Sequence, residues 1–298
     1  MSNDGNEGVM ELRRVRPLLG TLVEIVAGGL PEPQLTEAIN GGFSEVARVH
    51  RLMSAHDHQS DIGRLNRLAH RTAIRVHPWT WHVLQFAQTM AGETGGIFDV
   101  SVGGDLVRMG YLPRPCRVPA DLRSTWRDIE LLPGHLVRFE RPLNVDLGGI
   151  AKGFAVDQAI VALRAAGIRS GLVNAGGDLR VFGNVSRRIH VRNPSSPGQL
   201  IPCADITEGA LATSAGYFSR RQWRGRSVTA VVDGVRRTAS LSPFSASVFA
   251  PSCMLADALT KLVLVRGSGA TGLVNRLGGK AIILNGAVPS GPEMEQAA

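Results

Sequence analysis

The sequence predicts an α+β protein. Short apolar strands occur in pairs around glycine turns, long helical stretches lie between them, and regular strand–helix–strand units are few. Hydrophobic residues make up 44% of the 298 residues, which is typical of a globular protein with a large core. We expect residues 1–10 to form a disordered tail and residues 11–290 to form one domain.

The first third of the chain reads as one strand followed by three helices. Residues 18–28 (LLGTLVEIVAG) are typical of a buried strand. Helical spacing predicts helices over residues 33–53 and 61–68, and a third from residue 77 to the glycine pair at 95–96. Residues 97–106 (IFDVSVGGDL) are expected to be a strand that runs into a loop.

The rest of the chain contains more strands than helices. We expect a hairpin over residues 128–145, a helix over 150–166, two strands within 170–183, and a strand at 245–251 feeding a helix over 254–266. Residues 108–127 and 192–202 are expected to be surface loops. Further β segments are predicted at 189–194, 203–207, 210–216, 227–234 and 278–286.

Composition limits the partners and the location of the protein. The net charge is +8, but the arginines are scattered and aromatic residues make up only 5%, so we expect no nucleic-acid partner and favour an anionic small ligand. The three cysteines lack metal-type spacing, which indicates a reducing compartment. The N-terminus has no apolar leader and the chain has no long apolar run, so we expect a cytoplasmic protein without a transmembrane segment.

The stretch VDLGGIAKGFAVDQ is the first candidate binding site. Asp146 ends an apolar segment, Gly148 and Gly149 follow, and Lys152 lies in the first turn of the next helix. Glycines let the backbone approach a ligand closely, and a helix N-terminus with a lysine suits phosphate. A capped strand–turn–helix with a solvated lysine explains the motif equally well.

A second candidate is the apolar helix that carries Asp257. Thr260 and Lys261 share a helix face with Asp257, because they lie three and four residues further on. The carboxylate is a suitable ligand for Mg²⁺, with the Thr260 hydroxyl beside it. An exposed Asp257–Lys261 ion pair is the simpler explanation of this motif when it is taken alone.

Four further motifs are weak when each is considered alone. Asp99 lies between two glycine pairs, and the His56 segment resembles no zinc signature, so a solvated helix end is the simpler interpretation of the latter. Ordinary turns and strand ends also explain Asn174 with Asp178, and Thr213 with Ser214.

In their order along the chain these segments resemble the ApbE family, the FAD:protein FMN transferases. The resemblance covers residues 14–267 and rests on seven blocks: LLGTLVEI, MSAHDHQSDIGRLN, GGIFDVSVG, VDLGGIAKGFAVD, GLVNAGGDLRVFG, ALATSAG and SVFAPSCMLADALTKLVLVRG. It implies an ApbE-like fold of two related α/β lobes with the flavin between them. It also implies Mg²⁺-dependent cleavage of the FAD pyrophosphate and attachment of FMN, through a phosphoester bond, to a Thr or Ser of an acceptor flavoprotein.

The resemblance also implies which residues form the site. Gly149 and Asp257 fall at metal-ligand positions, and Thr260 is added as a metal ligand from its position alone. Eight residues fall at flavin-contact positions: Leu19, His56, Ile97, Phe98, Asp99, Asp146, Lys152 and Val232.

Several positions depart from the family pattern. Ala230 stands where the family has a histidine that is thought to activate the acceptor hydroxyl, so the catalytic base is unknown. Lys261 stands where a threonine ligand is common; its ammonium group cannot ligate a metal, but it could replace part of its charge or contact phosphate. His56 replaces a common tyrosine. Two alternatives therefore stay open: an FAD pyrophosphatase that releases FMN and AMP, and a non-catalytic flavin-binding protein.

Overall fold

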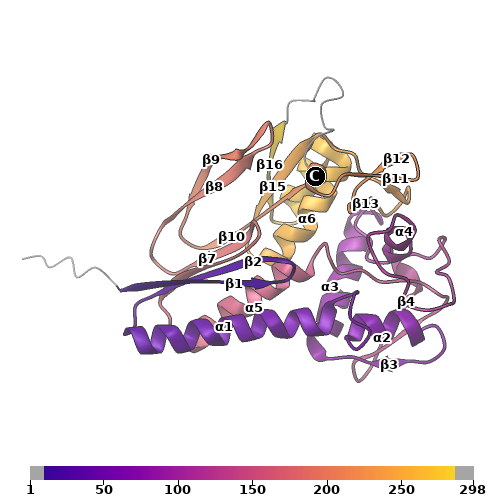
Figure 1. Ribbon diagram of the computed structural model, residues 1–298, viewed down its shortest axis with the longest axis horizontal. Helices are drawn as coiled ribbons and strands as arrows, with labels where there is room; N and C mark the ends of the chain where they lie inside the picture. The colour runs from indigo at the N-terminus through magenta and orange to yellow at the C-terminus, as the bar shows by residue number, and fades with distance from the viewer. Residues whose placement is uncertain (1–9, 286–298) are drawn as a thin grey trace, which may run out of the picture.

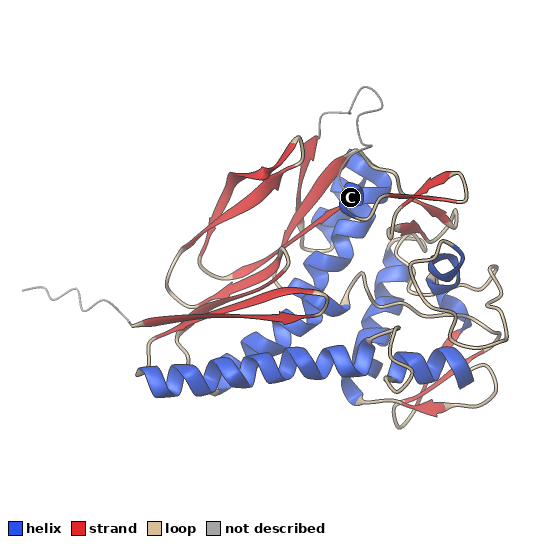
Figure 2. Cartoon of the chain, in the orientation of Figure 1, coloured by secondary structure: helices blue, strands red, loops and turns tan. Residues whose placement is uncertain are grey.

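The computed structural model of the protein describes residues 10–285 (Figure 1). Residues 1–9 of the expected tail, and residues 286–290 of the expected domain, lie outside the described residues. Helices and strands are mixed along the chain, which confirms the predicted α+β class (Figure 2). Within residues 10–285, no helix combines the length and apolarity needed to cross a membrane.

A seven-stranded antiparallel sheet organises the larger part of the molecule. Its neighbouring strands come from distant parts of the chain, so residues from the N-terminus, the middle and the C-terminus meet in one layer. In spatial order the strands are β1 (Glu11–Leu18), β2 (Thr21–Gly28), β6 (Ser170–Ala175), β7 (Asp178–Phe182), β10 (Gly209–Ala215), β15 (Phe244–Ala250) and β16 (Lys280–Asn285).

Each face of this sheet is covered by a different kind of element. Helices α1 (Glu32–Met53), α5 (Ala151–Ala165) and α6 (Cys253–Arg266) pack on one face (Figure 1). The hairpin of β8 (Arg187–Asn193) and β9 (Ser196–Ile206) covers part of the other face, over a separate apolar cluster that includes Leu179 and Val181. Since side chains alternate along a strand, Asp178 and Arg180 on β7 point to the helical side instead.

A smaller part of the molecule lies beside the ends of α1 and α6 (Figure 1). It contains α2 (Asp61–Leu68), α3 (Pro78–Glu93), α4 (Gly103–Arg108) and a sheet of β3 (Ile74–Arg75), β5 (Leu136–Phe139) and β4 (Ile129–Leu132). Two short hairpins join it to the larger part: β11 (Arg221–Trp223) with β12 (Arg226–Val228), and β13 (Val232–Asp233) with β14 (Thr238–Ala239). These two parts correspond to the two expected lobes; that the lobes are related stays a prediction.

Most predicted elements are confirmed, and several differ, among them α4 (Gly103–Arg108), which lies where a loop was expected. Residues 18–28 are not one strand but the turn and second strand of a hairpin whose first strand, β1, is too polar and exposed to be recognised. Residues 97–102 form a loop, because the Asp99 carboxylate accepts the Ser101 N–H at 2.8 Å and bends the backbone. The expected loop at 192–202 is mostly the β8–β9 hairpin, and α7 (Thr271–Arg276) was not predicted.

Candidate functional site

A cavity of about 430 Å³ opens between the β1–β2 turn, the end of α1 and the start of α5. Its wall brings together four of the eight predicted flavin-contact residues, Leu19, His56, Asp146 and Lys152, although 133 residues separate the first from the last. Aliphatic side chains supply the apolar part of the wall, namely Val49, Met53, Leu112 and Leu147. An apolar cavity with a few convergent charged groups is the usual form of a small-molecule site.

The β1–β2 turn presents Leu19 to the cavity through an unusual backbone conformation. Leu19 has a φ of 55° and Gly20 a φ of 70°, so both residues of this two-residue turn are left-handed. Such a turn matches the twist of a hairpin, but a left-handed leucine costs about 1 kcal/mol or more. Contacts of the Leu19 side chain with the main core hold it in place.

Lys152 is tied to the sheet by a buried aspartate. Its Nζ donates to the Asp178 carboxylate on β7, and Asp178 is fully buried while Lys152 is partly exposed at the cavity wall. The other Asp178 oxygen, Oδ1, has no hydrogen-bond partner among the described residues. Lys152 is therefore a positioned cation and not the freely solvated lysine of the simpler interpretation.

A second lysine–aspartate pair lies on α6, next to the first. Lys261 Nζ donates to Asp257 Oδ1, to Ser214 Oγ at 2.9 Å and to Thr260 Oγ1 at 3.1 Å. Asp257 and Thr260 are both fully buried. The ion pair expected as the simpler interpretation is therefore present, but it is buried and not exposed.

Close packing of α5 on α6 brings the two pairs together. A Cβ atom at Gly153 would lie 2.3 Å from the Cys253 carbonyl oxygen, so only glycine permits this approach. The approach lets the Gly153 N–H donate to Asp257 Oδ2 at 3.2 Å. Two aspartates and two lysines thus share one buried region, and Lys152 connects this region to the cavity wall.

Burial and neighbouring charges shift the pKa values of Asp178, Asp257 and Lys152. Burial and the Asp257 carboxylate raise the pKa of Asp178, although Lys152 and Lys261 oppose this. Burial also disfavours charge on Asp257, but the two lysines outweigh it and lower the pKa of Asp257. Burial opposes charge on Lys152 too, yet Asp178 and Asp257 raise the pKa of Lys152 above its ordinary value. Lys152 and Asp257 are therefore charged at neutral pH.

Asp146 lines the same cavity as Lys152. Its pKa is raised by burial, while the Gly148 N–H, His56 and Lys261 oppose that rise. The expected role of Asp146 as a helix cap is not found, since Ile150 is the N-cap of α5 and makes no side-chain cap. Asp146 instead faces the cavity.

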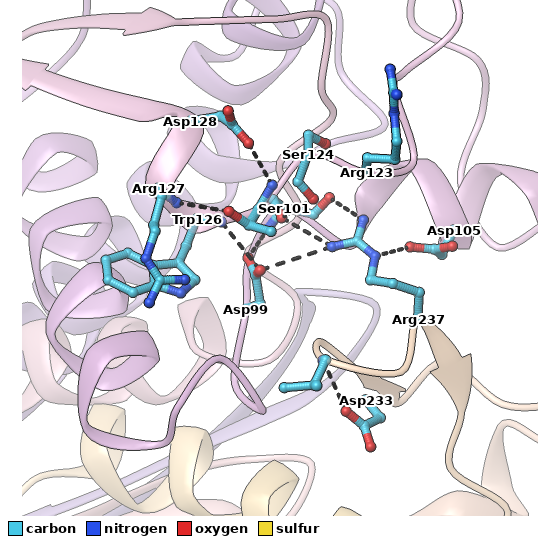
Figure 3. Close-up of polar contacts among 12 residues, drawn as sticks. Asp99, Ser101, Asp105, Arg123, Ser124, Trp126, Arg127, Asp128, Asp233 and Arg237 are labelled. Carbon is cyan, nitrogen blue, oxygen red and sulfur yellow. Dashed lines mark hydrogen bonds and ion pairs between the residues drawn. The ribbon is translucent and has the colours of Figure 1, made fainter.

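Asp99 belongs to a different network from the cavity residues (Figure 3). Its carboxylate accepts the N–H groups of Ser101 at 2.8 Å and Trp126 at 3.2 Å, and lies 3.8 Å from Arg237 Nη1. Arg237 also donates to Asp105 Oδ2 at 2.7 Å. This network joins the 95–101 loop to the β13–β14 hairpin, and Asp99 lines a second cavity of about 330 Å³.

The other predicted flavin contacts have structural surroundings. Val232 is buried in a small apolar cluster with Val102 and Leu106. Phe98 is buried in the main core, and its ring edge would lie 3.7 Å from a Cβ at Gly149, so it lies near the lysine–aspartate region. Ile97 is partly buried against the same core.

Two predicted features of surface segments can be compared with the structure. Asp57 accepts the Gln59 N–H at 2.8 Å and lies with His58 in an exposed turn after α1, as expected for a solvated helix end. Ala230, at the position of the family's histidine, is exposed, and its N–H donates to Ser219 Oγ at 3.1 Å.

Sequence reasoning did not select Asp178 and Ser214 as site residues, although both lie in quoted motifs. Asp178 lies on the face of β7 opposite to Leu179 and Val181, which are apolar. This alternation was the signal in the sequence that could have identified Asp178 as a site residue. Which face of β7 meets a helix with a lysine could not be read from one strand.

The expected Mg²⁺ ligands do not fit a divalent cation as they are arranged. Both Asp257 oxygens accept hydrogen bonds, from Gly153 N and Lys261 Nζ, and the Thr260 hydroxyl donates to the Asp257 carbonyl at 2.7 Å. A Cβ at Gly149 would lie 3.4 Å from Lys261 Cε, so the lysine chain passes beside all three expected ligands. Mg²⁺ requires nearly octahedral oxygen coordination, and an ammonium group supplies none.

Comparison with known proteins establishes the family of the chain. The model of the ApbE family matches residues 19–283, which is most of the sequence. The chain belongs to the ApbE family. Crystal structures of family members share the fold: the ApbE protein of Thermotoga maritima aligns with a TM-score of 0.83 and 24% identity over 93% of this chain and 94% of its own.

Relatives of this chain include proteins named FAD:protein FMN transferase. That of Vibrio cholerae is 31% identical over 233 residues, covering 72% of this chain and 69% of the relative. That of Rhodobacter capsulatus is 29% identical over 267 residues, covering 84% of this chain. The chain spans 50% of the length of the Rhodobacter relative. The structure of the flavin transferase ApbE from Vibrio cholerae aligns with a TM-score of 0.76 and 25% identity over 92% of this chain and 93% of its own.

Proposed function

We propose that this protein is an FAD:protein FMN transferase. In this reaction the pyrophosphate of FAD is cleaved, AMP leaves, and FMN is joined by a phosphoester bond to a Thr or Ser of an acceptor flavoprotein. Membership of the ApbE family supports the proposal, as do the relatives named FAD:protein FMN transferase. The cytoplasmic location expected from the sequence, and the absence of a nucleic-acid partner, stay predictions.

The observation that carries the proposal is Lys152, held by Asp178 at the wall of a cavity that also contains Leu19, His56 and Asp146. Lys152 lies in the first turn of α5, so its charge adds to the positive end of the helix dipole. A pyrophosphate carries negative charge that such a site stabilises. Phosphoryl transfer depends mainly on positioning and charge stabilisation, which this arrangement provides.

Each group in the cavity would have a distinct role. The apolar wall would bind the isoalloxazine ring or the adenine, and Lys152 would contact the pyrophosphate oxygens. Asp146, whose pKa is raised, lines the cavity and would orient the ribityl or ribose hydroxyls. The base that takes the acceptor proton is unassigned, because Ala230 replaces the family's histidine.

Ala230 also supports a second candidate, an FAD pyrophosphatase that releases FMN and AMP. Without a base for the acceptor hydroxyl, water is the simpler nucleophile. A flavin-binding protein without catalysis is the third possibility.

One incubation separates these functions. Purified protein is mixed with FAD and an acceptor peptide that carries a Thr, with either Mg²⁺ or EDTA, and AMP, free FMN and flavinylated peptide are quantified by mass spectrometry. The transferase is supported by AMP and flavinylated peptide in equal amounts, both lost in Lys152→Met. Free FMN with AMP would identify the pyrophosphatase, and bound FAD without AMP the binding protein.

A further inference from the structure

Lys261 lies where the family resemblance implies a metal ion. Its Nζ contacts the Asp257 carboxylate and the Thr260 hydroxyl, and its side chain passes beside Gly149. These three residues are the expected ligand set. The ammonium therefore has the contacts, on two of the three expected ligands, that a cation bound to them would make.

The ammonium is held in this place from several directions. Ser214 on β10 accepts one N–H at 2.9 Å and is itself 2.8 Å from the Thr260 hydroxyl. Asp257 is fixed on its other oxygen by the Gly153 N–H. An ammonium group has three N–H donors, and Asp257, Ser214 and Thr260 provide an acceptor for each.

Charge in this region is already balanced without a metal. Lys152 and Lys261 together offset Asp178 and Asp257, which are both fully buried. A divalent cation on Asp257 would add two positive charges within contact distance of the Lys261 ammonium. Like charges at such a distance repel strongly in a buried region, so the metal and the ammonium compete for one place.

We propose that the Lys261 ammonium is a built-in cation that takes the place of the metal ion, so that this protein binds the pyrophosphate of FAD without Mg²⁺. The proposal rests on the proposed function, since it concerns the binding of the same substrate. With Lys152 it provides two positive charges near the Asp257 carboxylate. Lys152 would donate N–H groups to the pyrophosphate, and Lys261, whose three donors are taken, would contribute its positive charge in place of the metal.

The proposal is tested by measuring the affinity for FAD with isothermal titration calorimetry, once in EDTA and once in excess Mg²⁺. Wild-type affinity is expected to change by less than about twofold between the two conditions. Lys261→Thr, which restores an oxygen ligand, is expected to bind FAD about tenfold or more weakly in EDTA and to regain affinity with Mg²⁺, because the positive charge of Lys261 is lost and the metal replaces it. Lys280→Thr is the matched control, because Lys280 is exposed on β16.

Three further measurements keep the result interpretable. Thermal unfolding shows whether Lys261→Thr is folded, and Lys261→Arg keeps the charge and should stay independent of Mg²⁺. Binding of Mn²⁺, followed by electron paramagnetic resonance, is expected for Lys261→Thr and not for the wild type. Wild-type FAD binding that requires Mg²⁺, or tight Mn²⁺ binding by the wild type, would overturn the proposal.

AMP release separates this proposal from the proposed function. FAD binding that is independent of metal but is not accompanied by AMP release would support the built-in cation and contradict the proposed transferase function. AMP release and FMN transfer that both depend on Mg²⁺ would support the transferase function and contradict the built-in cation. If the folded wild type binds FAD in neither condition, both proposals are wrong.

Discussion

Asp157 and Asp257 each accept hydrogen bonds from the first turn of the other's helix. Asp157 on α5 accepts the N–H groups of Cys253 at 3.0 Å and Met254 at 2.9 Å, and Asp257 on α6 accepts that of Gly153 at 3.2 Å. The positive ends of two helix dipoles meet here, and the two carboxylates offset them. The site is therefore built on a contact between two helix N-termini.

We expect Asp157→Ala to destabilise the protein by about 2 kcal/mol, because two N–H groups of α6 lose their acceptor. Arg180 Nη1, 2.7 Å from Asp157, would lose its partner as well. Urea unfolding measures the change in the free energy of unfolding. Asp205→Ala, which removes an exposed partner of Arg188, should change it by less than about 0.5 kcal/mol. Equal effects of both variants would contradict the capping role.

Gly153→Ala tests the close packing of α5 on α6. The new methyl group would lie 2.3 Å from the Cys253 carbonyl oxygen, so the helices must separate at a cost of about 1–3 kcal/mol. Gly41→Ala in the middle of α1 is the control, because nothing lies within 4 Å of its Cβ position. That variant should stabilise the protein by about 0.5–1 kcal/mol. Thermal unfolding of both variants decides, and a neutral Gly153→Ala would refute the packing argument.

The Asp257–Lys261 pair should behave as one unit. Asp257→Asn and Lys261→Met each leave a buried charge without its partner, at a cost of about 3–5 kcal/mol. The double variant removes both charges, so its destabilisation should be well below the sum of the two. A double-mutant cycle from denaturant unfolding measures the coupling. Additivity within about 0.5 kcal/mol would show that the two residues do not interact.

Asp99 should make stability depend on pH. Burial raises the pKa of Asp99 above its ordinary value of 3.8, despite the opposing Ser101 and Trp126 N–H groups and Arg237. The folded state therefore binds the proton more tightly than the unfolded state, and this contribution is lost as the pH rises. The free energy of unfolding of the wild type, minus that of Asp99→Asn, should fall as the pH rises above the ordinary pKa of the carboxyl group, 3.8. A difference that rises with pH would reverse the assignment.

Ala230→His tests the missing base. If the transferase lacks a group that takes the acceptor proton, a histidine at this exposed position should raise transfer to a Thr peptide by about tenfold or more, with FAD affinity unchanged. Mass spectrometry of the peptide and calorimetry with FAD measure the two effects. Ala230→Gln, of similar size but without a titratable ring, should leave transfer at the wild-type rate. An equal gain in both variants would argue against a proton-accepting role.

Local pattern was sufficient to predict several features of this protein. Helical spacing predicted α1 and α3, because each packs an apolar face on the core and this repeat is visible along the chain. The short spacing of Asp146 and Lys152 also placed them near one another. Both line the same cavity because only a turn separates them.

The partners of those residues were decided by the tertiary structure. Lys152 meets Asp178, 26 residues away, because β7 lies under the start of α5 with its charged face toward the helices. Gly153 meets Asp257, 104 residues away, because a glycine lets α5 and α6 touch. Asp99 lies near Arg237, because hydrogen bonds to the loop backbone orient its side chain. A loop lacks the alternation of side chains along a strand, so the direction of this side chain could not be predicted from the sequence. A single sequence determines which segments carry charge, whereas the packing of distant segments decides which charges meet.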